Sequence, residues 1–274
     1  MDPFHDLHDG NRIPFIGFGT WPMDDAQAQA AVQVALHAGY RLIDTAARYG
    51  NERGVGLGLR DAGIAREDIL VTTKLAGADQ GFDGTLRAFD ASLRKLGIDY
   101  VDLYLIHWPL PRLDKYVDSW KAMLRLQQDG RIRSVGVSNF EPAHIERLQA
   151  ETGVLPAVNQ IELHPEFQQP RLREWLAQRH IQVESWSPLG RGETLHHPQL
   201  QGIAQRLGRS VAQVILRWHV QLGLVPIPKS QDPARIAQNH AVTDFELGAE
   251  DLAAIAALDG ARRQGGDPAT HEEF

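Results

Sequence analysis

Four residues with side chains suited to proton transfer follow short apolar runs in the first half of the chain. Asp44, Lys74 and His107 each end such a run, and Tyr49 lies five residues after Asp44. The intervals of 30 and 33 residues (74 − 44 and 107 − 74) are each about one strand–helix unit. Side chains at equivalent ends of parallel strands converge on one mouth of a barrel, so we expect these four to meet there. Taken singly, each could be a structural ion pair or a satisfied polar group.

Together these side chains could protonate an oxygen atom. A free phenol has a pKa of about 10 and is a poor acid at neutral pH. A Lys74 ammonium near Tyr49 would stabilise the phenolate and lower the pKa of the phenol, while Asp44 would hold the ammonium in place. His107 could orient a carbonyl oxygen. The set has no strong nucleophile and no shell of metal ligands, and the sequence has no cysteine. We therefore expect proton donation to an oxygen on which charge develops.

Alternating strands and helices are needed to bring these residues together, and the sequence predicts them. Apolar runs predict strands over residues 41–45, 69–74, 101–107, 134–138, 157–163, 182–187, 224–228 and 242–246. Amphipathic segments predict helices that include residues 26–38, 85–96, 116–128, 170–178, 211–222 and 249–258. This alternation indicates βαβ units and a parallel sheet. Eight strands would close a (β/α)8 TIM barrel, which is an α/β fold.

Residues 6–18 lie outside this alternation. Asp9-Gly10-Asn11 separates short extended pieces, and Asp-Gly is a strong signal for a tight hairpin. We expect an N-terminal β-hairpin that closes the bottom of the barrel, with a loose arm as the alternative. The length of 274 residues is compatible with one or two domains. Because no linker divides the chain, we expect residues 1–274 to form a single barrel domain.

Composition narrows the class of protein. A hydrophobic fraction of 43% with 23% charged residues is typical of a globular protein with a large core. The net charge of −7 argues against a general nucleic-acid binder. We see no secretory signal at the N-terminus and no run of about 18 apolar residues that would span a membrane. The cytoplasm is the expected location.

Two other kinds of motif are incomplete. Gly17-Phe18-Gly19 and Gly56-Leu57-Gly58 each lack the third glycine of a dinucleotide-binding fingerprint. The histidine pairs His5 with His8 and His196 with His197 lack further ligands at metal-binding spacing. We expect no metal site and solvated histidines in loops.

The order, spacing and flanking sequence of Asp44, Tyr49, Lys74 and His107 resemble the catalytic tetrad of the aldo-keto reductases. The similarity runs from the hairpin to about Asn239 and includes the segments 42–46, 103–109, 135–140 and 227–230. Bacterial 2,5-diketo-D-gluconate reductase-like enzymes are the most similar subgroup. The resemblance implies an NADPH-dependent oxidoreductase that converts an aldehyde or ketone to an alcohol. It also implies a monomer whose only partner is a small carbonyl substrate.

Roles for individual residues follow from this resemblance. Tyr49 would be the proton donor, tuned by Lys74 and Asp44, and His107 would position the substrate. The substrate would contact Trp21, Tyr49, His107 and Trp108. Binding of NADPH or NADP+ is expected to involve Gly19, Thr20, Trp21, Asp44, Ser138, Asn139, Gln160, Trp186, Ser187, Leu189, Arg191, Lys229, Ser230, Arg235, Gln238 and Asn239.

Within that set, the resemblance implies which part of the cofactor each group of residues would bind. Ser138, Asn139 and Gln160 would bind the carboxamide of the nicotinamide, and Trp186 would stack on its ring. The turn-rich segment 187–192 can bring backbone N–H groups to a pyrophosphate. Lys229, Ser230 and Arg235, the last at an expected helix N-terminus, suit an anion. The resemblance implies that this anion is the 2′-phosphate of NADPH.

Three departures from the family pattern bear on the site. Gln238 stands where Glu is common, and Trp186 replaces the more usual Tyr. Ala76-Gly77 replaces a Trp-Asn pair whose Trp normally walls the substrate pocket, so we expect a wider or more mobile pocket. Trp21, Trp108 and residues 263–274 remain as candidate walls.

Two rival functions remain open from the sequence. The barrel could serve as a cofactor-sensing or scaffold subunit without turnover, which an intact tetrad argues against. It could also be a hydrolase or isomerase that uses Asp44 and His107 as acid and base. That reading leaves the anion site at Lys229 and Arg235 unexplained.

Overall fold

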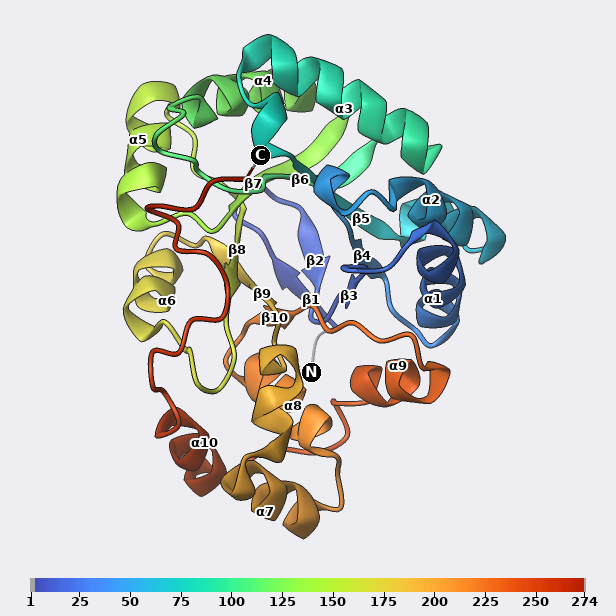
Figure 1. Ribbon diagram of the computed structural model, residues 1–274, viewed down its shortest axis with the longest axis vertical. Helices are drawn as coiled ribbons and strands as arrows, with labels where there is room; N and C mark the ends of the chain where they lie inside the picture. Colours follow the sequence, from blue (N-terminus) through green and yellow to red (C-terminus); the bar gives the residue numbers. More distant parts are fainter. Residues whose placement is uncertain (1–2, 274) are drawn as a thin grey trace.

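The computed structural model describes residues 3–273, and its central element is a sheet of eight parallel strands. Figure 1 shows these strands surrounded by a ring of helices. The strands are β3 (Phe18–Gly19), β4 (Leu42–Asp44), β5 (Leu70–Leu75), β6 (Val101–Ile106), β7 (Ile132–Ser138), β8 (Val158–Glu162), β9 (Gln182–Trp186) and β10 (Val225–Pro226). Neighbours in the sheet are neighbours in the chain. The fold is the expected (β/α)8 barrel.

Backbone hydrogen bonds between the first and last strands close the sheet. Gly17 N–H donates to Pro226 O, and Gly19 N–H donates to Pro228 O, each at 3.0 Å. A Cβ on Gly17 would lie 2.5 Å from Ile227 Cδ1, so glycine is needed where these strands approach each other. The barrel therefore has no open edge along this seam.

The eighth strand is not where the sequence pattern predicted it. Residues 242–246 form no strand and follow α9 as an irregular segment. The eighth position belongs to β3, which the sequence analysis had assigned to the end of the hairpin segment. A two-residue strand is too short to show an alternating pattern, which explains the error. The other seven predicted strands all overlap strands of the barrel.

The helices pack on the outside of the sheet. They are α1 (Asp25–His37), α2 (Glu52–Asp61), α3 (Phe82–Leu96), α4 (Tyr116–Gln128), α5 (Pro142–Thr152), α6 (Pro170–Ala177), α7 (Pro198–Leu207), α8 (Val211–Gln221), α9 (Pro233–His240) and α10 (Ala249–Ala256). All six predicted helices are confirmed to within three residues at either end. The glycines of α2 allow close packing: Cβ atoms on Gly54 and Gly56 would clash with the backbone of Asp25 and Leu96.

The expected N-terminal hairpin is present. β1 (Phe4–Asp6) pairs antiparallel with β2 (Arg12–Pro14). Leu7 and Ile13 of this segment are buried in one cluster with barrel residues such as Leu42 and Val158. The hairpin also bonds to the start of β7, where Asn11 Nδ2 donates to Ser134 Oγ at 3.0 Å. It therefore closes the N-terminal end of the barrel and leaves the opposite end for the site.

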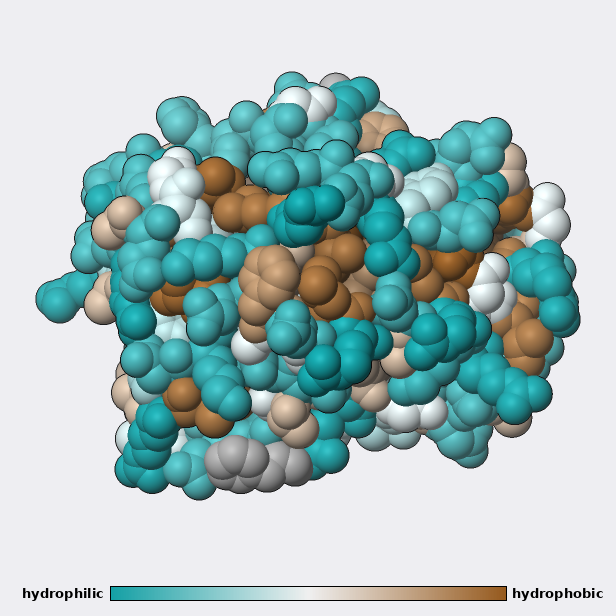
Figure 2. Space-filling view, turned by 90° about the horizontal axis from the view of Figure 1, so that it is seen from above, coloured by the Kyte–Doolittle hydropathy of each residue, from teal (hydrophilic) through white to brown (hydrophobic). Residues whose placement is uncertain are grey.

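The surface seen in Figure 2 is largely hydrophilic, with apolar residues in patches between polar ones. Among residues 3–273, the exposed large hydrophobic side chains are Phe4, Trp21, Phe82, Val154 and Leu222. Within the same residues, no helix is both long and apolar enough to cross a bilayer.

Candidate active site

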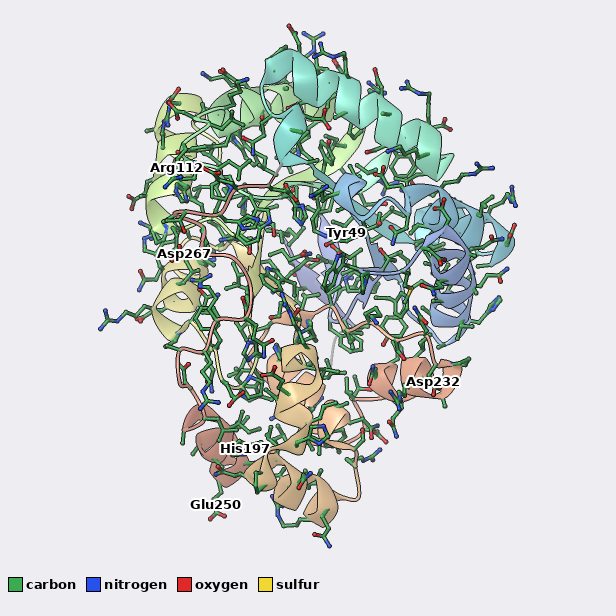
Figure 3. The ribbon with its side chains drawn as sticks, viewed as in Figure 1. Tyr49, Arg112, His197, Asp232, Glu250 and Asp267 are labelled. Atoms are coloured by element: carbon green, nitrogen blue, oxygen red, sulfur yellow. The ribbon has the colours of Figure 1, made fainter. Side chains whose placement is uncertain are left out.

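Asp44, Tyr49 and Lys74 meet at the C-terminal mouth of the barrel. Asp44 ends β4, and Lys74 lies near the end of the neighbouring β5. Lys74 Nζ is 2.6 Å from Asp44 Oδ1 and 3.2 Å from Tyr49 Oη, and it also donates to Thr45 O at 3.0 Å. Figure 3 shows Tyr49 over the centre of the barrel. The predicted convergence of these three residues is confirmed.

The order of β4 and β5 explains this contact. Asp44 pairs in register with Thr72, so Lys74 lies two residues farther along β5 on the same face. Tyr49 comes from the short 3-10 turn Ala47–Tyr49, which follows β4 directly. The turn places the phenol over the end of the strand, within 3.2 Å of the Lys74 ammonium.

Electrostatics in this group differ from the sequence-based expectation in one respect. Burial raises the pKa of Tyr49, and the nearby Lys74 ammonium lowers it, but the net pKa is above its usual 10. The carboxylates of Asp44 and Glu273 add to the rise. The expected net lowering of the phenol pKa is therefore wrong in this arrangement, because the lysine is outweighed by burial and two anions.

Lys74 itself remains a cation. Burial disfavours its charge, but Asp44 and Tyr49 outweigh burial, so the net pKa of Lys74 is raised. Its side chain is fully buried, and that of Asp44 is 4% exposed. A buried pair of this kind needs further hydrogen bonds to offset desolvation, and Thr45 O supplies one of them.

His107 joins the group from the loop after β6. Its ring lies edge-on to that of Tyr49, with centroids 5.8 Å apart and an interplanar angle of 73°. Glu273, from the far end of the chain, also reaches this ring, with Oε1 2.6 Å from His107 Nδ1. The carboxylate therefore lies against the ring, although this contact does not have the geometry of a hydrogen bond. All four predicted tetrad residues thus lie at one mouth.

A second buried carboxylate lies behind Asp44. Gln160 Nε2 donates to Asp44 Oδ2 at 2.8 Å and to Glu184 Oε2 at 2.9 Å. Burial and the Asp44 charge raise the pKa of Glu184 to about 8, while the hydrogen bond from Gln160 and the Lys74 charge oppose the rise. Glu184 therefore carries a proton at neutral pH.

The residues expected at the nicotinamide form one hydrogen-bonded network. Trp186 Nε1 donates to Asn139 Oδ1 at 2.8 Å, and Asn139 Nδ2 donates to His107 O at 3.0 Å and to Ser138 Oγ at 3.1 Å. Ser138 Oγ in turn donates to Gln160 O at 2.8 Å. Asn139 holds a left-handed backbone with φ 63°, which Asn tolerates better than most residues. The predicted Ser138, Asn139, Gln160 and Trp186 lie together.

Cations expected to bind phosphate lie around α9. Lys229 and Arg235 are exposed, and Ser230 is partly exposed. The prediction that Arg235 lies at a helix N-terminus is confirmed. Asp232 caps this helix by accepting from Ala234 N and Arg235 N, so its own carboxylate already uses two of the free N–H groups. Of the two further residues expected to bind the cofactor here, Gln238 is exposed and Asn239 is buried.

The loop after β9 completes the other side of this region. Ser187 and Arg191 hold left-handed backbones with φ near 50° (49° and 50°), and Leu189 is partly buried between them. The Arg191 guanidinium lies 6.0 Å from the centre of the Trp21 ring, so this loop faces the segment after β3. Within that segment, Gly19 N–H helps close the barrel, and Thr20 Oγ1 donates to Asp44 O at 3.0 Å.

Two tryptophans were expected to contact substrate. Trp21 is 50% exposed, beside Arg191. Trp108 is buried, and the His271 ring lies against it with centroids 4.0 Å apart. Residues of the 263–273 segment therefore form part of the mouth, as expected, while Phe274 lies outside the described residues.

The space beside Gly77 is not left open. A Cβ on Gly77 would lie 2.5 Å from Glu273 O and 2.5 Å from Leu110 Cδ1. The wider pocket expected from Ala76-Gly77 is thus filled by the chain's own C-terminal segment in this arrangement.

Sequence reasoning did not identify Glu162 and Glu184 as parts of the mouth, and it included Glu273 only as one member of the candidate wall 263–274, without a contact to His107. Glu162 ends β8 and is fully buried; its oxygens accept from Gln264 N at 2.6 Å and Gly265 N at 2.8 Å. Glu162 lies two residues after Gln160 on β8, and Glu184 lies two residues before Trp186 on β9. Residues two apart on a strand face the same side, so this spacing could have identified both glutamates. Glu273 has no such signal, because it reaches the site from a segment without strand or helix.

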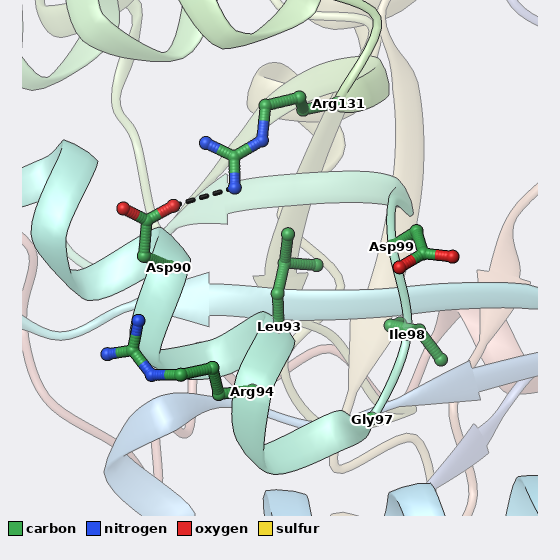
Figure 4. Close-up of a pocket in the computed structure, with 7 residues that line it drawn as sticks. All are labelled: Asp90, Leu93, Arg94, Gly97, Ile98, Asp99 and Arg131. Carbon is green, nitrogen blue, oxygen red and sulfur yellow. Dashed lines mark hydrogen bonds and ion pairs between the residues drawn. The ribbon is translucent and has the colours of Figure 1, made fainter.

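Other features lie away from this mouth. The depression drawn in Figure 4 is lined by Asp90, Leu93, Arg94, Gly97, Ile98, Asp99 and Arg131. It adjoins the starts of β6 and β7 and therefore lies at the opposite end of the barrel. His197 lies at the periphery in Figure 3. Within residues 3–273, no group of three or more His, Cys, Asp or Glu side chains is placed to hold a metal.

Comparison with known proteins agrees with the geometry. The model of the "Aldo/keto reductase family" matches residues 15–260. An aldo-keto reductase of Mycolicibacterium smegmatis is 53% identical over 270 residues, which cover 98% of each chain. Methylglyoxal reductase DkgA of Escherichia coli is 48% identical over 264 residues, covering 96% of this chain and 95% of its own.

A solved structure is similar over almost the whole chain. The crystal structure of a variant of Gox0644 in complex with NADPH is 47% identical, covers 98% of both chains and superimposes with a TM-score of 0.94. A family match over most of the barrel, together with relatives of about half-identical sequence, fixes the assignment. The chain belongs to the aldo/keto reductase family.

Proposed function

We propose that this protein reduces aldehydes and ketones to alcohols, with NADPH as hydride donor and Tyr49 as proton donor. The observation that carries the proposal is the chain of contacts at the barrel mouth. Tyr49 Oη, Lys74 Nζ and Asp44 Oδ1 are joined by distances of 3.2 and 2.6 Å, and the His107 ring lies against that of Tyr49. Such a group suits the protonation of a carbonyl oxygen.

The residues would act as follows. NADPH, when bound, supplies the hydride, because no amino-acid side chain can donate one. His107 orients the carbonyl oxygen beside Tyr49. As negative charge develops on that oxygen, the Tyr49 hydroxyl donates its proton to it, and the product alcohol forms.

The raised pKa of Tyr49 is compatible with this role. It keeps the phenol protonated at neutral pH, and an alkoxide is far more basic than a phenolate, so the proton still moves downhill. The phenolate left behind lies 3.2 Å from the Lys74 ammonium, which stabilises it until solvent restores the proton. Asp44 keeps that ammonium charged and in place.

The residues present fit NADPH. Amide and hydroxyl side chains at Ser138, Asn139 and Gln160 match the carboxamide in hydrogen-bonding chemistry. The exposed cations Lys229 and Arg235 match a phosphate, and the structure of Gox0644 contains NADPH. Trp186, partly exposed and fixed through its Nε1 by Asn139, offers a ring on which the nicotinamide can stack.

The geometry disfavours the rival hydrolase or isomerase. Both Asp44 oxygens accept hydrogen bonds from buried protein groups, Lys74 and Gln160, so Asp44 is engaged in positioning.

We propose in addition that residues 1–274 act as one barrel domain, and that the protein is a cytoplasmic monomer. Size-exclusion chromatography with light scattering tests the last point, and a mass of about twice 30.5 kDa would contradict it.

A panel of aldehydes and ketones tests the activity. Because relatives include methylglyoxal reductases, the panel contains methylglyoxal beside aromatic and aliphatic aldehydes. We expect loss of NADPH absorbance with at least one small carbonyl, and slower loss with NADH. A protein that binds NADPH but turns over no carbonyl would instead support the cofactor-sensing role.

A further inference from the structure

Glu273 occupies the place beside the catalytic histidine. Its side chain is 7% exposed, although it belongs to a segment with no helix or strand. Oε1 lies 2.6 Å from His107 Nδ1, and Oε2 accepts from the backbone N–H of Gly77 at 2.9 Å. A carboxylate is thus held at the mouth by an imidazole and an amide of the catalytic end.

Several contacts hold residues 264–273, called here the C-terminal segment, across the mouth. Buried Glu162 accepts from the backbone N–H groups of Gln264 and Gly265. The His271 ring lies on Trp108, and Arg112 Nη1 donates to Glu272 Oε1 at 2.9 Å. In Figure 1 the chain that follows α10 passes α6 and reaches the neighbourhood of β6 and β7. Its path brings Glu273 to His107.

Gly77 makes room for this arrangement. Any side chain there would meet Glu273 O and Leu110 Cδ1 at 2.5 Å, which is closer than real Cβ atoms come to other heavy atoms. Glu273 can therefore take this position only because residue 77 is a glycine.

The carboxylate is charged at neutral pH. Burial raises the pKa of Glu273, but His107, the Gly77 N–H group and Arg48 outweigh burial, and the net pKa is lowered. A charged group at this position also raises the pKa of Tyr49. Because Glu273 Oε1 lies 2.6 Å from His107 Nδ1, a carbonyl oxygen cannot approach that side of the ring while Glu273 is in place.

We propose that Glu273 is a tethered competitor of the substrate, bound in a carboxylate site formed by His107 and the Gly77 N–H group. The inference rests on the proposed function for its kinetic consequence. A carbonyl substrate must displace Glu273 to reach His107, and free monocarboxylates bind the same site once Glu273 is removed. Substrates with a carboxylate at this position compete directly with Glu273 for the same two groups.

The size of the effect follows from occupancy. If Glu273 fills the site in nine molecules out of ten, the apparent affinity of any competitor is about tenfold weaker than its intrinsic affinity. A tethered side chain presents itself at an effective concentration on the order of millimolar, so dilute external carboxylates compete poorly with it.

The test compares Glu273→Ala with Glu272→Ala. Glu272 is the neighbouring acid on the same segment, 44% exposed and paired with Arg112 at the surface. Benzoate is titrated into each full-length protein by calorimetry with NADP+ in excess. We expect Glu273→Ala to bind benzoate about tenfold more tightly than wild type, and Glu272→Ala to resemble wild type. Equal benzoate affinity in wild type and Glu273→Ala would overturn the proposal.

A second variant moves the carboxylate without removing it. Gly77→Ala crowds Glu273 out of the site but keeps the backbone N–H group, so it should also gain benzoate affinity. It decides the question if Glu273→Ala fails to fold. Turnover gives a separate readout: KM for a neutral aldehyde should fall in Glu273→Ala. Absence of any turnover in wild type would refute the proposed function alone, because the benzoate titration needs no turnover.

Discussion

The carboxyl groups of Asp44 and Glu184 share one hydrogen-bond donor. Gln160 Nε2 lies 2.8 Å from Asp44 Oδ2 and 2.9 Å from Glu184 Oε2, inside the barrel and away from solvent. Asp44 is already paired with Lys74, so a second negative charge at Glu184 would repel the first without a cation of its own. The barrel therefore favours the protonated form of Glu184.

This relationship predicts a pH-dependent stability. The pKa of Glu184 is raised from 4.5 to about 8, so the folded chain holds a proton that the unfolded chain releases between these values. Wild-type stability contains a contribution that falls as pH rises through this window. Glu184→Gln removes it, so the Tm of the variant minus that of wild type should increase from pH 5 to pH 8 and then level off. Glu250→Gln, at an exposed position of α10, is the control, and a Glu184→Gln difference that is flat with pH would contradict the assignment.

Removal of Lys74 should cost both activity and stability. In Lys74→Met the buried Asp44 carboxylate loses its cation, which typically costs about 3–5 kcal/mol of unfolding free energy. Adding Asp44→Asn should recover part of that stability, because the uncompensated charge is gone, but should recover no turnover. Urea unfolding and kcat measure the two effects. A double variant as unstable as Lys74→Met would show that the pair is not the cause.

Arg235 should discriminate between the two nicotinamide cofactors. If it contacts the 2′-phosphate, Arg235→Ala loses a charge-assisted hydrogen bond of about 1.5–3 kcal/mol, which corresponds to roughly 10–150-fold weaker binding of NADPH. NADH lacks that phosphate, so its affinity should hardly change. Lys121→Ala, on the outer face of α4, serves as control. Equal losses of affinity for NADH and NADPH would show that Arg235 does not contact the 2′-phosphate.

The sequence was sufficient to predict the barrel and the tetrad, for a physical reason. Strands such as β6 and β7 are apolar over Leu103–Ile106 and Val135–Val137, and the polar groups that follow these runs stand out against that background. The spacing of Asp44, Lys74 and His107 then follows from the length of a strand–helix unit. Short elements carry no such signal: two-residue β3 was missed, and residues 242–246 were assigned to a strand that does not exist.

Contacts between distant segments lay beyond sequence reasoning. Nothing near Glu273 indicates that it reaches His107, 166 residues earlier in the chain (273 − 107). The rise in the pKa of Tyr49 has the same origin, since it depends on burial and on the positions of Asp44 and Glu273 in space. The type of a residue predicts its possible chemistry, whereas its pKa depends on all its neighbours.

Replacement of Tyr49 by Phe tests the central claim most directly. The variant keeps the ring against His107 and removes only the hydroxyl that Lys74 contacts. With a carbonyl that wild type reduces, we predict that kcat falls by about 10²–10⁴-fold while the Kd for NADPH, followed by fluorescence, is unchanged. A kcat close to that of wild type would show that the proton comes from another group.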